Sequence, residues 1–132
     1  MTFVSGTKKL KYVIHKHYAS HLHYDLRLEM KGVLKSWAVP KEPPLEKGVK
    51  RLAIQVEDHR IGYEKFEGTI PKGQYGAGKV QIWDSGYYKV LNQAKDRIEF
   101  DIAGKKLKGT FILIKFKAKN SKKEKEWLFF KK

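Results

Sequence analysis

The sequence predicts an all-β protein, folded as one compact β-barrel with little helix. Apolar residues recur at every second position in most segments, which is the periodicity of strands and not of helices. The strand-like segments are short and follow one another at intervals of about a dozen residues, as in small barrels and sandwiches. No segment has a long helical periodicity, which argues against alternating strand–helix units. We therefore expect residues 1–132 to form a single domain, with residues 1–11 as a short N-terminal arm.

The clearest strand is LHYDLRLEMK, residues 22–31. Its apolar face consists of Leu22, Tyr24, Leu26, Leu28 and Met30. This alternation is typical of a strand with one face on a core and the other in water. The pair Lys31-Gly32 predicts a tight turn into a second strand at 33–39, so that the two strands form a hairpin.

Three prolines, Pro40, Pro43 and Pro44, predict an irregular loop over residues 40–50. The segment RLAIQVE, residues 51–57, alternates again and predicts the next strand. Further short strands are expected at 66–70, 78–83, 86–91, 97–102, 108–116 and 126–131. The lysine-rich stretch before the last of them, residues 117–125, predicts a solvated hairpin loop that is either a plain turn or a contact to phosphate.

The composition excludes several classes of protein. The 132 residues contain no cysteine, which excludes disulfides, thiolate catalysis and Cys-ligated zinc or iron–sulfur sites. No apolar run approaches the roughly 20 residues of a membrane span, and the N-terminus lacks the apolar stretch of a secretory signal. We expect a cytoplasmic monomer without a membrane partner.

The net charge of +15, from 29 Lys and Arg against 14 Asp and Glu, predicts a polyanionic partner. Nucleic acid is favoured over an anionic membrane because no strongly amphipathic helix is visible. The alternative is a lysine-rich surface that serves only solubility. Few of the cations are arginines, so each arginine is a candidate for bidentate binding of phosphate.

Four of the five histidines fall in the segment HKHYASHLH. By alternation, His23, Asp25 and Arg27 share one strand face, where they offer a metal a nitrogen and an oxygen ligand beside a guanidinium for phosphate. Either His17 or His21 can complete the metal site. Strand parity favours His21, whereas His17 needs a bend in the chain to reach that face, and the spacing does not decide between them.

A second row of ionisable residues follows the strand predicted at 51–57. Arg51, Gln55, Glu57 and His59 lie opposite its apolar side chains. One interpretation is that both polar rows meet water, as on any antiparallel sheet. The other is that the rows converge on a barrel mouth or cleft, where metal ligands, arginines and a histidine suit hydrolysis of a phosphate ester. There His59 can protonate a leaving oxygen or stabilise the transition state.

Residues 73–79, GQYGAGK, match most of the nucleotide-binding pattern G-x-x-x-x-G-K, but two features exclude that role. Val80 stands in place of Ser or Thr, and a strand is predicted where a phosphate loop opens a helix. Gly73, Gly76 and Gly78 instead predict turns or a close approach of backbones.

Two long segments carry a family resemblance: KHYASHLHYDLRLEMKGVLKSWAVPKEPP and RLAIQVEDHRIGYEKFEGTIPKGQYGAGKVQIWDSGYY. Together they are similar to the 3′-phosphoesterase domain of bacterial DNA ligase D, over about residues 12–130. The resemblance implies a compact β-barrel that uses a divalent metal on the 3′ ends of DNA or of primer-templates. It implies removal of a 3′-phosphate, and shortening of a 3′-ribonucleotide tract by a ribonuclease step followed by that phosphatase step. The 3′-OH product implies a DNA ligase or polymerase acting in the same repair pathway.

Carried over residue by residue, the resemblance makes His17, His23 and Asp25 the metal ligands, and so prefers His17 to His21. Mn²⁺ is the expected metal. Co²⁺, Zn²⁺ and Ni²⁺ suit the same set of two imidazoles and one carboxylate.

The expected catalytic residues are Arg27, Glu57, His59 and Tyr63. The resemblance places Arg27, His59 and Tyr63 against the scissile phosphate, with metal binding as the alternative for His59. It matches Glu57 to an acidic residue that the ribonuclease step needs. The residues expected to contact phosphate or substrate are His15, Arg27, Lys41, Arg51, Gln55, His59 and Tyr63.

Two departures from the family bear on activity. His15 stands where the family usually has Gln, two residues before the first metal histidine, which affects how the ribose or the metal is held. In ligase D a longer N-terminal arm supports the ribonuclease step, whereas about ten residues precede the first strand here. We therefore expect 3′-phosphatase activity to be retained and ribonucleoside removal to be weaker or differently specific.

The alternative to an enzyme is a noncatalytic β-barrel that binds single-stranded nucleic acid or DNA ends. Such a barrel needs the charge and the aromatic residues but not the His and Asp cluster. A metal-dependent phosphatase for small molecules is disfavoured by the charge of +15.

Overall fold

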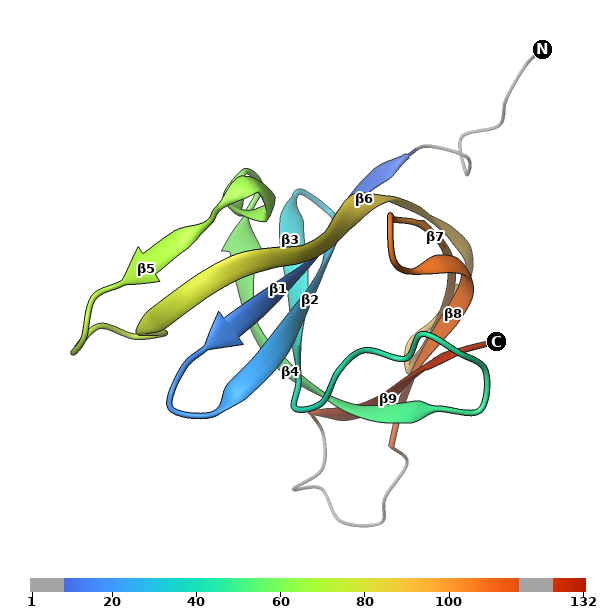
Figure 1. Cartoon of the computed structure of the whole chain (residues 1–132). Helices are drawn as coiled ribbons and strands as arrows, with labels where there is room; N and C mark the ends of the chain where they lie inside the picture. The colour runs from blue at the N-terminus through green and yellow to red at the C-terminus, as the bar shows by residue number, and fades with distance from the viewer. Residues whose placement is uncertain (1–8, 117–124) are drawn as a thin grey trace.

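The computed structural model of the chain describes residues 9–116 and 125–132, which form an antiparallel β-barrel (Figure 1). The strands in this part of the chain are β1 (Leu10–Tyr18), β2 (Leu22–Met30), β3 (Val33–Val39), β4 (Lys50–Arg60), β5 (Gly68–Ile70), β6 (Gly78–Ala94), β7 (Arg97–Ala103), β8 (Lys108–Lys115) and β9 (Glu126–Lys131). A turn of 3-10 helix, η2 (Tyr63–Lys65), lies between β4 and β5. No described helix has the length and apolar character needed to cross a membrane.

The strands close into a ring in the order β1-β2-β3-β4-β9-β8-β7-β6, and β6 returns to pair with β1. The short strand β5 adds to the start of β6 outside this ring. Figure 1 shows the ring, with β5 and η2 projecting from one side of it. The predicted all-β barrel is confirmed.

Side chains that point into the ring form one apolar core. Leu26 of β2 is fully buried there, as are Phe100 and Phe129, whose rings stack with centroids 6.3 Å apart. Trp37 packs edge-to-face on Trp127 at 5.8 Å. Burial of each large apolar side chain contributes roughly 1.5–3 kcal/mol, so this core is the main source of stability.

The hairpin and most strand positions agree with the sequence analysis. Lys31 and Gly32 both have positive φ, 50° and 83°, which is the backbone of the tight turn that the pair predicts. The predicted lysine-rich loop over 117–125 and the predicted arm over 1–11 lie largely outside the described residues. Within that arm, Leu10 and Lys11 belong to β1.

β6 is one continuous strand where the sequence predicts two short ones. Asp84 and Gly86 are residue types that often occur in turns, but here both contact neighbouring segments of the chain and the strand continues through them. The buried Asp84 carboxylate accepts hydrogen bonds from the Tyr12 hydroxyl and from the backbone N–H groups of residues 105–107. A Cβ on Gly86 would lie 2.1 Å from the carbonyl oxygen of Ala103, so the glycine permits the close approach of β7.

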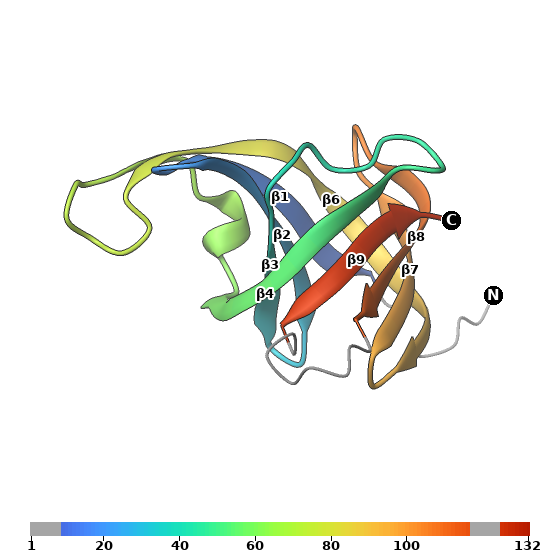
Figure 2. The ribbon, with the colours of Figure 1, turned by 90° about the horizontal axis from the view of Figure 1, so that it is seen from below.

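The strand predicted at 66–70 is also shorter than expected, since only Gly68–Ile70 pair with β6. It belongs to a covering segment, residues 61–77, of which η2 lies against the outside of the barrel (Figure 2). This covering segment is tied to the wall at several points. The Lys11 ammonium lies 3.3 Å from the Glu64 carboxylate, and Glu67 accepts a hydrogen bond from the backbone N–H of Ile82. Val13, on the same face as Lys11, is fully buried although it lies outside the apolar core of the ring. Part of the outer wall is therefore a second buried layer.

Candidate metal and phosphate site

The turn between β1 and β2 brings two distant histidines together. Antiparallel pairing sets His17 opposite His23. Asp25 shares the outer face with His23, because alternate residues of a strand face the same side. The turn at residues 19–21 supplies the bend that His17 needs. The structure groups His17 with His23 and Asp25, and leaves His21 exposed in the turn.

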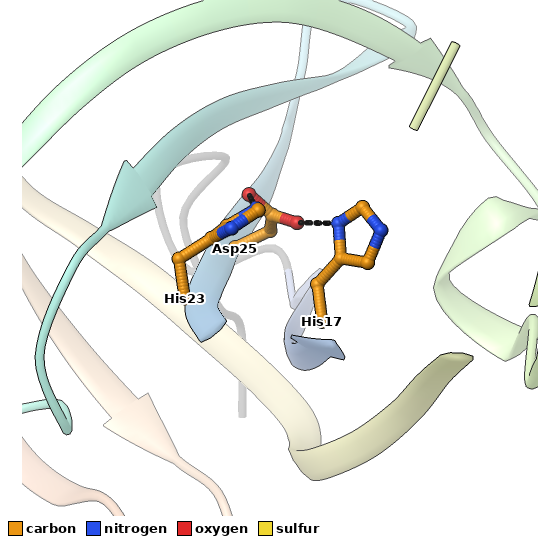
Figure 3. Close-up of side chains that lie close together, drawn as sticks. All are labelled: His17, His23 and Asp25. Atoms are coloured by element: carbon orange, nitrogen blue, oxygen red, sulfur yellow. Dashed lines mark ion pairs between the residues drawn. The ribbon is translucent and has the colours of Figure 1, made fainter. Parts of the chain in front are cut away.

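The three side chains of this triad have ligand atoms that all lie within 4.8 Å of one another. Asp25 lies between the two imidazoles (Figure 3). Its carboxylate oxygens are 3.5 Å from Nδ1 of His17 and 3.2 Å from Nε2 of His23. Two imidazole nitrogens and a carboxylate oxygen at this spacing fit one divalent cation of the Mn²⁺, Co²⁺, Zn²⁺ and Ni²⁺ group.

Backbone carbonyls set the orientation of both imidazoles. Nε2 of His17 lies 2.8 Å from the carbonyl oxygen of Gly76, and Nδ1 of His23 lies 3.1 Å from that of His21. A carbonyl only accepts, so these nitrogens donate. The opposite nitrogens keep a lone pair for a metal ion in the neutral rings, and donate to a carboxylate in the protonated rings. Those nitrogens face Asp25. Imidazoles that ligate a metal show this arrangement, with the other N–H held by a carbonyl or carboxylate.

The triad carries a permanent negative charge at Asp25. Burial acts to raise the pKa of this carboxyl, but hydrogen bonds from His17 and His23 and the charge of Arg27 outweigh burial and hold the pKa well below its usual range. The same hydrogen bond to Asp25 raises the pKa of His23. A buried carboxylate that stays ionised is a suitable oxygen ligand for a divalent metal ion.

Arg27 is held beside the triad with little freedom. Its Nε donates to Nδ1 of His15 at 3.1 Å, and its Nη1 donates to the Ser36 hydroxyl at 2.8 Å and to Nδ1 of His59 at 3.0 Å. Its Nη2 lies 3.5 Å from the Asp25 carboxylate. A guanidinium has five N–H groups, so these contacts leave one on Nη2 for a ligand such as phosphate.

His15 is a fully buried positioning residue. Because its Nδ1 accepts from Arg27, its proton lies on Nε2, which donates to the carbonyl of Phe66 at 3.0 Å. Burial and the charge of Arg27 lower the pKa of His15 to about 4, so the ring is neutral. One acceptor and one donor are also what a glutamine amide offers. His15 thus makes the same kinds of contact that a Gln, the usual residue of the family here, could make. The His15 side chain does not line the cavity formed by the triad, Arg27, His59 and Tyr63.

His59 is also neutral at neutral pH, since burial and the charge of Arg27 lower its pKa. Nδ1 of His59 lies near both Arg27 and the Glu57 carbonyl, at 3.0 and 3.2 Å. Arg27 can only donate, so Nδ1 accepts and the proton lies on Nε2. That N–H is a hydrogen-bond donor for a bound group.

Tyr63 of η2 closes the site with an aromatic wall. Its ring stacks on Phe66 at 5.1 Å, lies 4.7 Å from His59 and 5.3 Å from His15, and covers the Arg27 guanidinium at 5.0 Å. Burial raises the pKa of the Tyr63 hydroxyl, which therefore stays protonated.

These groups line one cavity of about 620 Å³ between the outer wall of the barrel and the covering segment. Its lining includes His17, His23, Asp25, Arg27, His59 and Tyr63. A volume of this size is in the range of small-ligand sites, roughly 300–1,000 Å³. The two predicted polar rows do converge in part, on the outer wall and not at a barrel mouth.

The sequence of this chain matches a known protein family. The sequence profile of the DNA Ligase D 3′-phosphoesterase domain matches residues 15–115. The chain belongs to this family. It is 48% identical to the multifunctional non-homologous end joining protein LigD of Pseudomonas aeruginosa, over 96% of the chain and 15% of that protein. It is 47% identical to the protein of the same name from Mycolicibacterium smegmatis, over 83% of the chain and 16% of that protein. The chain thus spans only a small part of the length of these relatives.

Besides His15, four residues predicted for the site of this ligase D domain do not line the cavity. Lys41 and Glu57 are exposed, and neither lines the 620 Å³ cavity. Arg51 donates from Nε to the carbonyl of Glu42 at 2.6 Å, which ties the proline-rich loop to β4. Gln55 lines a different hollow, of about 270 Å³, beside the tryptophans of the core.

A bulge in β4 explains why the second predicted row divides. Pairing with β3 shifts register between Leu34 and Ser36, so three residues of β4 span two of β3. The shift puts Val56 and His59 on the cavity side together, although alternation places them on opposite faces. Sequence parity has no means of detecting an extra residue in a strand.

Sequence reasoning missed three groups that position this ligase D-type site. Ser36 could have been found, because the Lys31-Gly32 turn pairs it with Arg27 and both then face the same side. The carbonyls of Phe66 and Gly76 could not, since backbone acceptors on an irregular segment leave no pattern of side chains.

Proposed function

We propose that this chain is a divalent-metal-dependent phosphoesterase that removes a 3′-phosphate from nucleic-acid ends and leaves a 3′-OH. One observation carries the proposal: a metal-type ligand triad, a fixed arginine and a neutral histidine line a single cavity. Membership in the ligase D 3′-phosphoesterase family supports the reaction. The net charge of +15 supports a nucleic-acid substrate over a small molecule.

Nδ1 of His17, Nε2 of His23 and the Asp25 carboxylate would hold the metal, for which we propose Mn²⁺, with Co²⁺, Zn²⁺ and Ni²⁺ as substitutes. When bound, the metal supplies positive charge to the phosphoryl oxygens.

The residues of the chain bind and orient the phosphate. The free N–H of Arg27 binds one phosphoryl oxygen as a charged donor, and Nε2–H of His59 donates to another. We assign His59 to stabilising the transition state through this N–H, in preference to protonating the leaving group, because burial and Arg27 disfavour its charged form. Tyr63 holds both side chains in place and excludes water from one side. Water attacks phosphorus, the bond from phosphorus to O3′ breaks, and O3′ takes a proton from water, which yields inorganic phosphate and the 3′-OH.

Removal of a 3′-ribonucleoside is proposed as the weaker activity. Glu57, which the family resemblance assigns to that step, is exposed and lies at the bulge next to His59. Lys41 and Arg51 then serve at longer range, through the positive charge that attracts the backbone. A DNA ligase or polymerase that consumes the 3′-OH is the proposed partner in repair.

The test uses a 5′-labelled primer-template with a 3′-phosphate, incubated with and without Mn²⁺. Wild-type protein should convert the 3′-phosphate to a 3′-OH only with the metal, and Asp25→Ala should not convert it. Asp58→Ala is the matched control, because Asp58 is an exposed carboxylate paired with Lys35 outside the cavity. Tight binding of DNA without conversion under any divalent metal would instead support the noncatalytic end-binding barrel.

A further inference from the structure

Tyr75 is the most exposed large hydrophobic side chain in the described part of the chain. It is 81% exposed, against 52% for Leu91 and 50% for Tyr87. It nevertheless lines the same cavity as the metal-type triad and Arg27. The proposed hydrolysis does not use the Tyr75 side chain, although the Gly76 carbonyl of the same GQYGAGK stretch orients His17. An aromatic ring held in water at the rim of a site is a typical surface for a flat ligand.

The loop around Tyr75 has a defined shape. Gly73 and Gly76 have φ values of +88° and +76°, which side chains rarely adopt. Backbone hydrogen bonds from Gln74 to Pro71 and from Ala77 to Gln74 close two successive turns. These features fix the backbone on both sides of Tyr75.

The same loop is joined to the triad. The Gly76 carbonyl, one residue after Tyr75, holds Nε2 of His17. Gly78 lies so close to β1 that a Cβ there would be 2.1 Å from the Tyr18 carbonyl oxygen. A ligand on the Tyr75 ring is therefore placed relative to the metal ligands by short backbone connections.

The lining of the cavity combines two kinds of chemistry. The triad, Arg27 and His59 supply charged and polar groups, and Ile70 and Tyr75 add an aliphatic and an aromatic surface. If Gly76 carried a Cβ, that atom would lie 3.7 Å from Cδ1 of Ile70, so the Ile70 side chain lies next to the loop. A phosphate attached to a flat, partly apolar group matches both parts, and a nucleotide has this composition.

We propose that Tyr75 and Ile70 form a nucleobase subsite, which stacks the base of the nucleotide that carries the 3′-phosphate. This inference rests on the proposed function and identifies how the terminal nucleotide is recognised. Stacking accepts any of the four bases, because every base has a π-face. The subsite favours a nucleotide end over a phosphate that carries no base.

The test measures directly whether a fluorescent base stacks on the protein, and it needs no turnover. A primer with 2-aminopurine at the 3′-phosphorylated end is titrated with protein in EDTA, and its fluorescence is measured. We expect wild type and Tyr75→Phe to quench the base, and Tyr75→Ala to lose the quenching and to bind about tenfold more weakly. Tyr87→Ala is the matched control, because Tyr87 is exposed on β6 and lines no part of this cavity.

A second readout uses catalysis. The KM for a 3′-phosphate on a normal nucleotide should be lower than for one on an abasic residue, and Tyr75→Ala should remove that difference. Equal quenching by wild type and Tyr75→Ala, or no quenching by wild type, would overturn the subsite. Absence of Mn²⁺-dependent turnover would overturn the proposed function alone, since the fluorescence titration needs no turnover. Loss of folding in Tyr75→Ala is checked by thermal unfolding, and Tyr75→Phe keeps the ring in any case.

Discussion

The inside of the barrel and the outer face of β1, β2 and β3 are both buried, yet their chemistry is opposite. Leu26 and Phe100 fill the inside with apolar packing. Asp25 and Arg27, which alternate with the inward residues of β2, are almost as buried on the outer face, under the covering segment. The comparison shows that one strand can stabilise the fold with one face and orient charged groups with the other.

The difference has a physical basis. Apolar side chains gain free energy from leaving water, whereas buried charges lose hydration and need partners. On the outer face each charged group has such partners, and Arg27 is bonded to His15, Ser36 and His59. Such preorganisation costs stability but suits the proposed role of this site, which is to hold phosphate in a fixed position.

The largest expected effect is on stability, from the inside of the barrel. Phe100→Ala removes a ring with no exposed surface and should lower the free energy of unfolding by about 3–5 kcal/mol. His23→Ala, on the outer face and with a side chain that is 25% exposed, should lower it by less than about 1 kcal/mol while abolishing the proposed activity. Urea unfolding of both variants measures the difference. Similar losses of stability would show that the outer face also carries the fold.

A smaller effect is expected at His15, which holds Arg27 without lining the cavity. His15→Ala removes both the acceptor for Arg27 and the donor to Phe66, and should lower kcat on a 3′-phosphate end by about 10- to 100-fold. His15→Gln restores one acceptor and one donor, and should stay close to wild type. A His15→Gln variant as slow as His15→Ala would contradict a positioning role through hydrogen bonds.

The smallest effect is expected where the covering segment is tied to the wall. Burial acts to raise the pKa of Glu64, but backbone hydrogen bonds and Lys11 outweigh it and lower the pKa from its ordinary 4.5. The folded state therefore favours the carboxylate, and this contribution is present above pH 4.5 and is lost as the pH falls through the lowered pKa. Glu64→Gln should cost about 1 kcal/mol or less at neutral pH.

Unfolding of the wild type and of Glu64→Gln is compared at pH 7 and at pH 3. The gap between the two proteins should be narrower at pH 3, because the preference of the folded state for the carboxylate is lost progressively below pH 4.5. A gap that widens on acidification would refute the assigned direction of the pKa shift. Lys11→Met, which removes only the cation of the pair, is the matched variant.

The two regions also differ in how much of their structure could be predicted from the residues alone. Alternation of apolar residues sets which side chains of β2 face the core, so the strands at 22–31 and 33–39 and their turn were predictable. The row His23, Asp25 and Arg27 was predictable for the same reason. The second row was not, because the bulge in β4 separates Glu57 from His59.

The sequence by itself determined the all-β class, the hairpin and the family to which the chain is similar. Those properties follow from composition and from contacts between near neighbours in the chain. Only the tertiary structure decided that His17 completes the triad by strand geometry, that a segment more than 30 residues further along buries Arg27, and that the loop of Tyr75 reaches His17. Such contacts depend on how strands pair and how an irregular segment folds back, and local periodicity does not predict either of these.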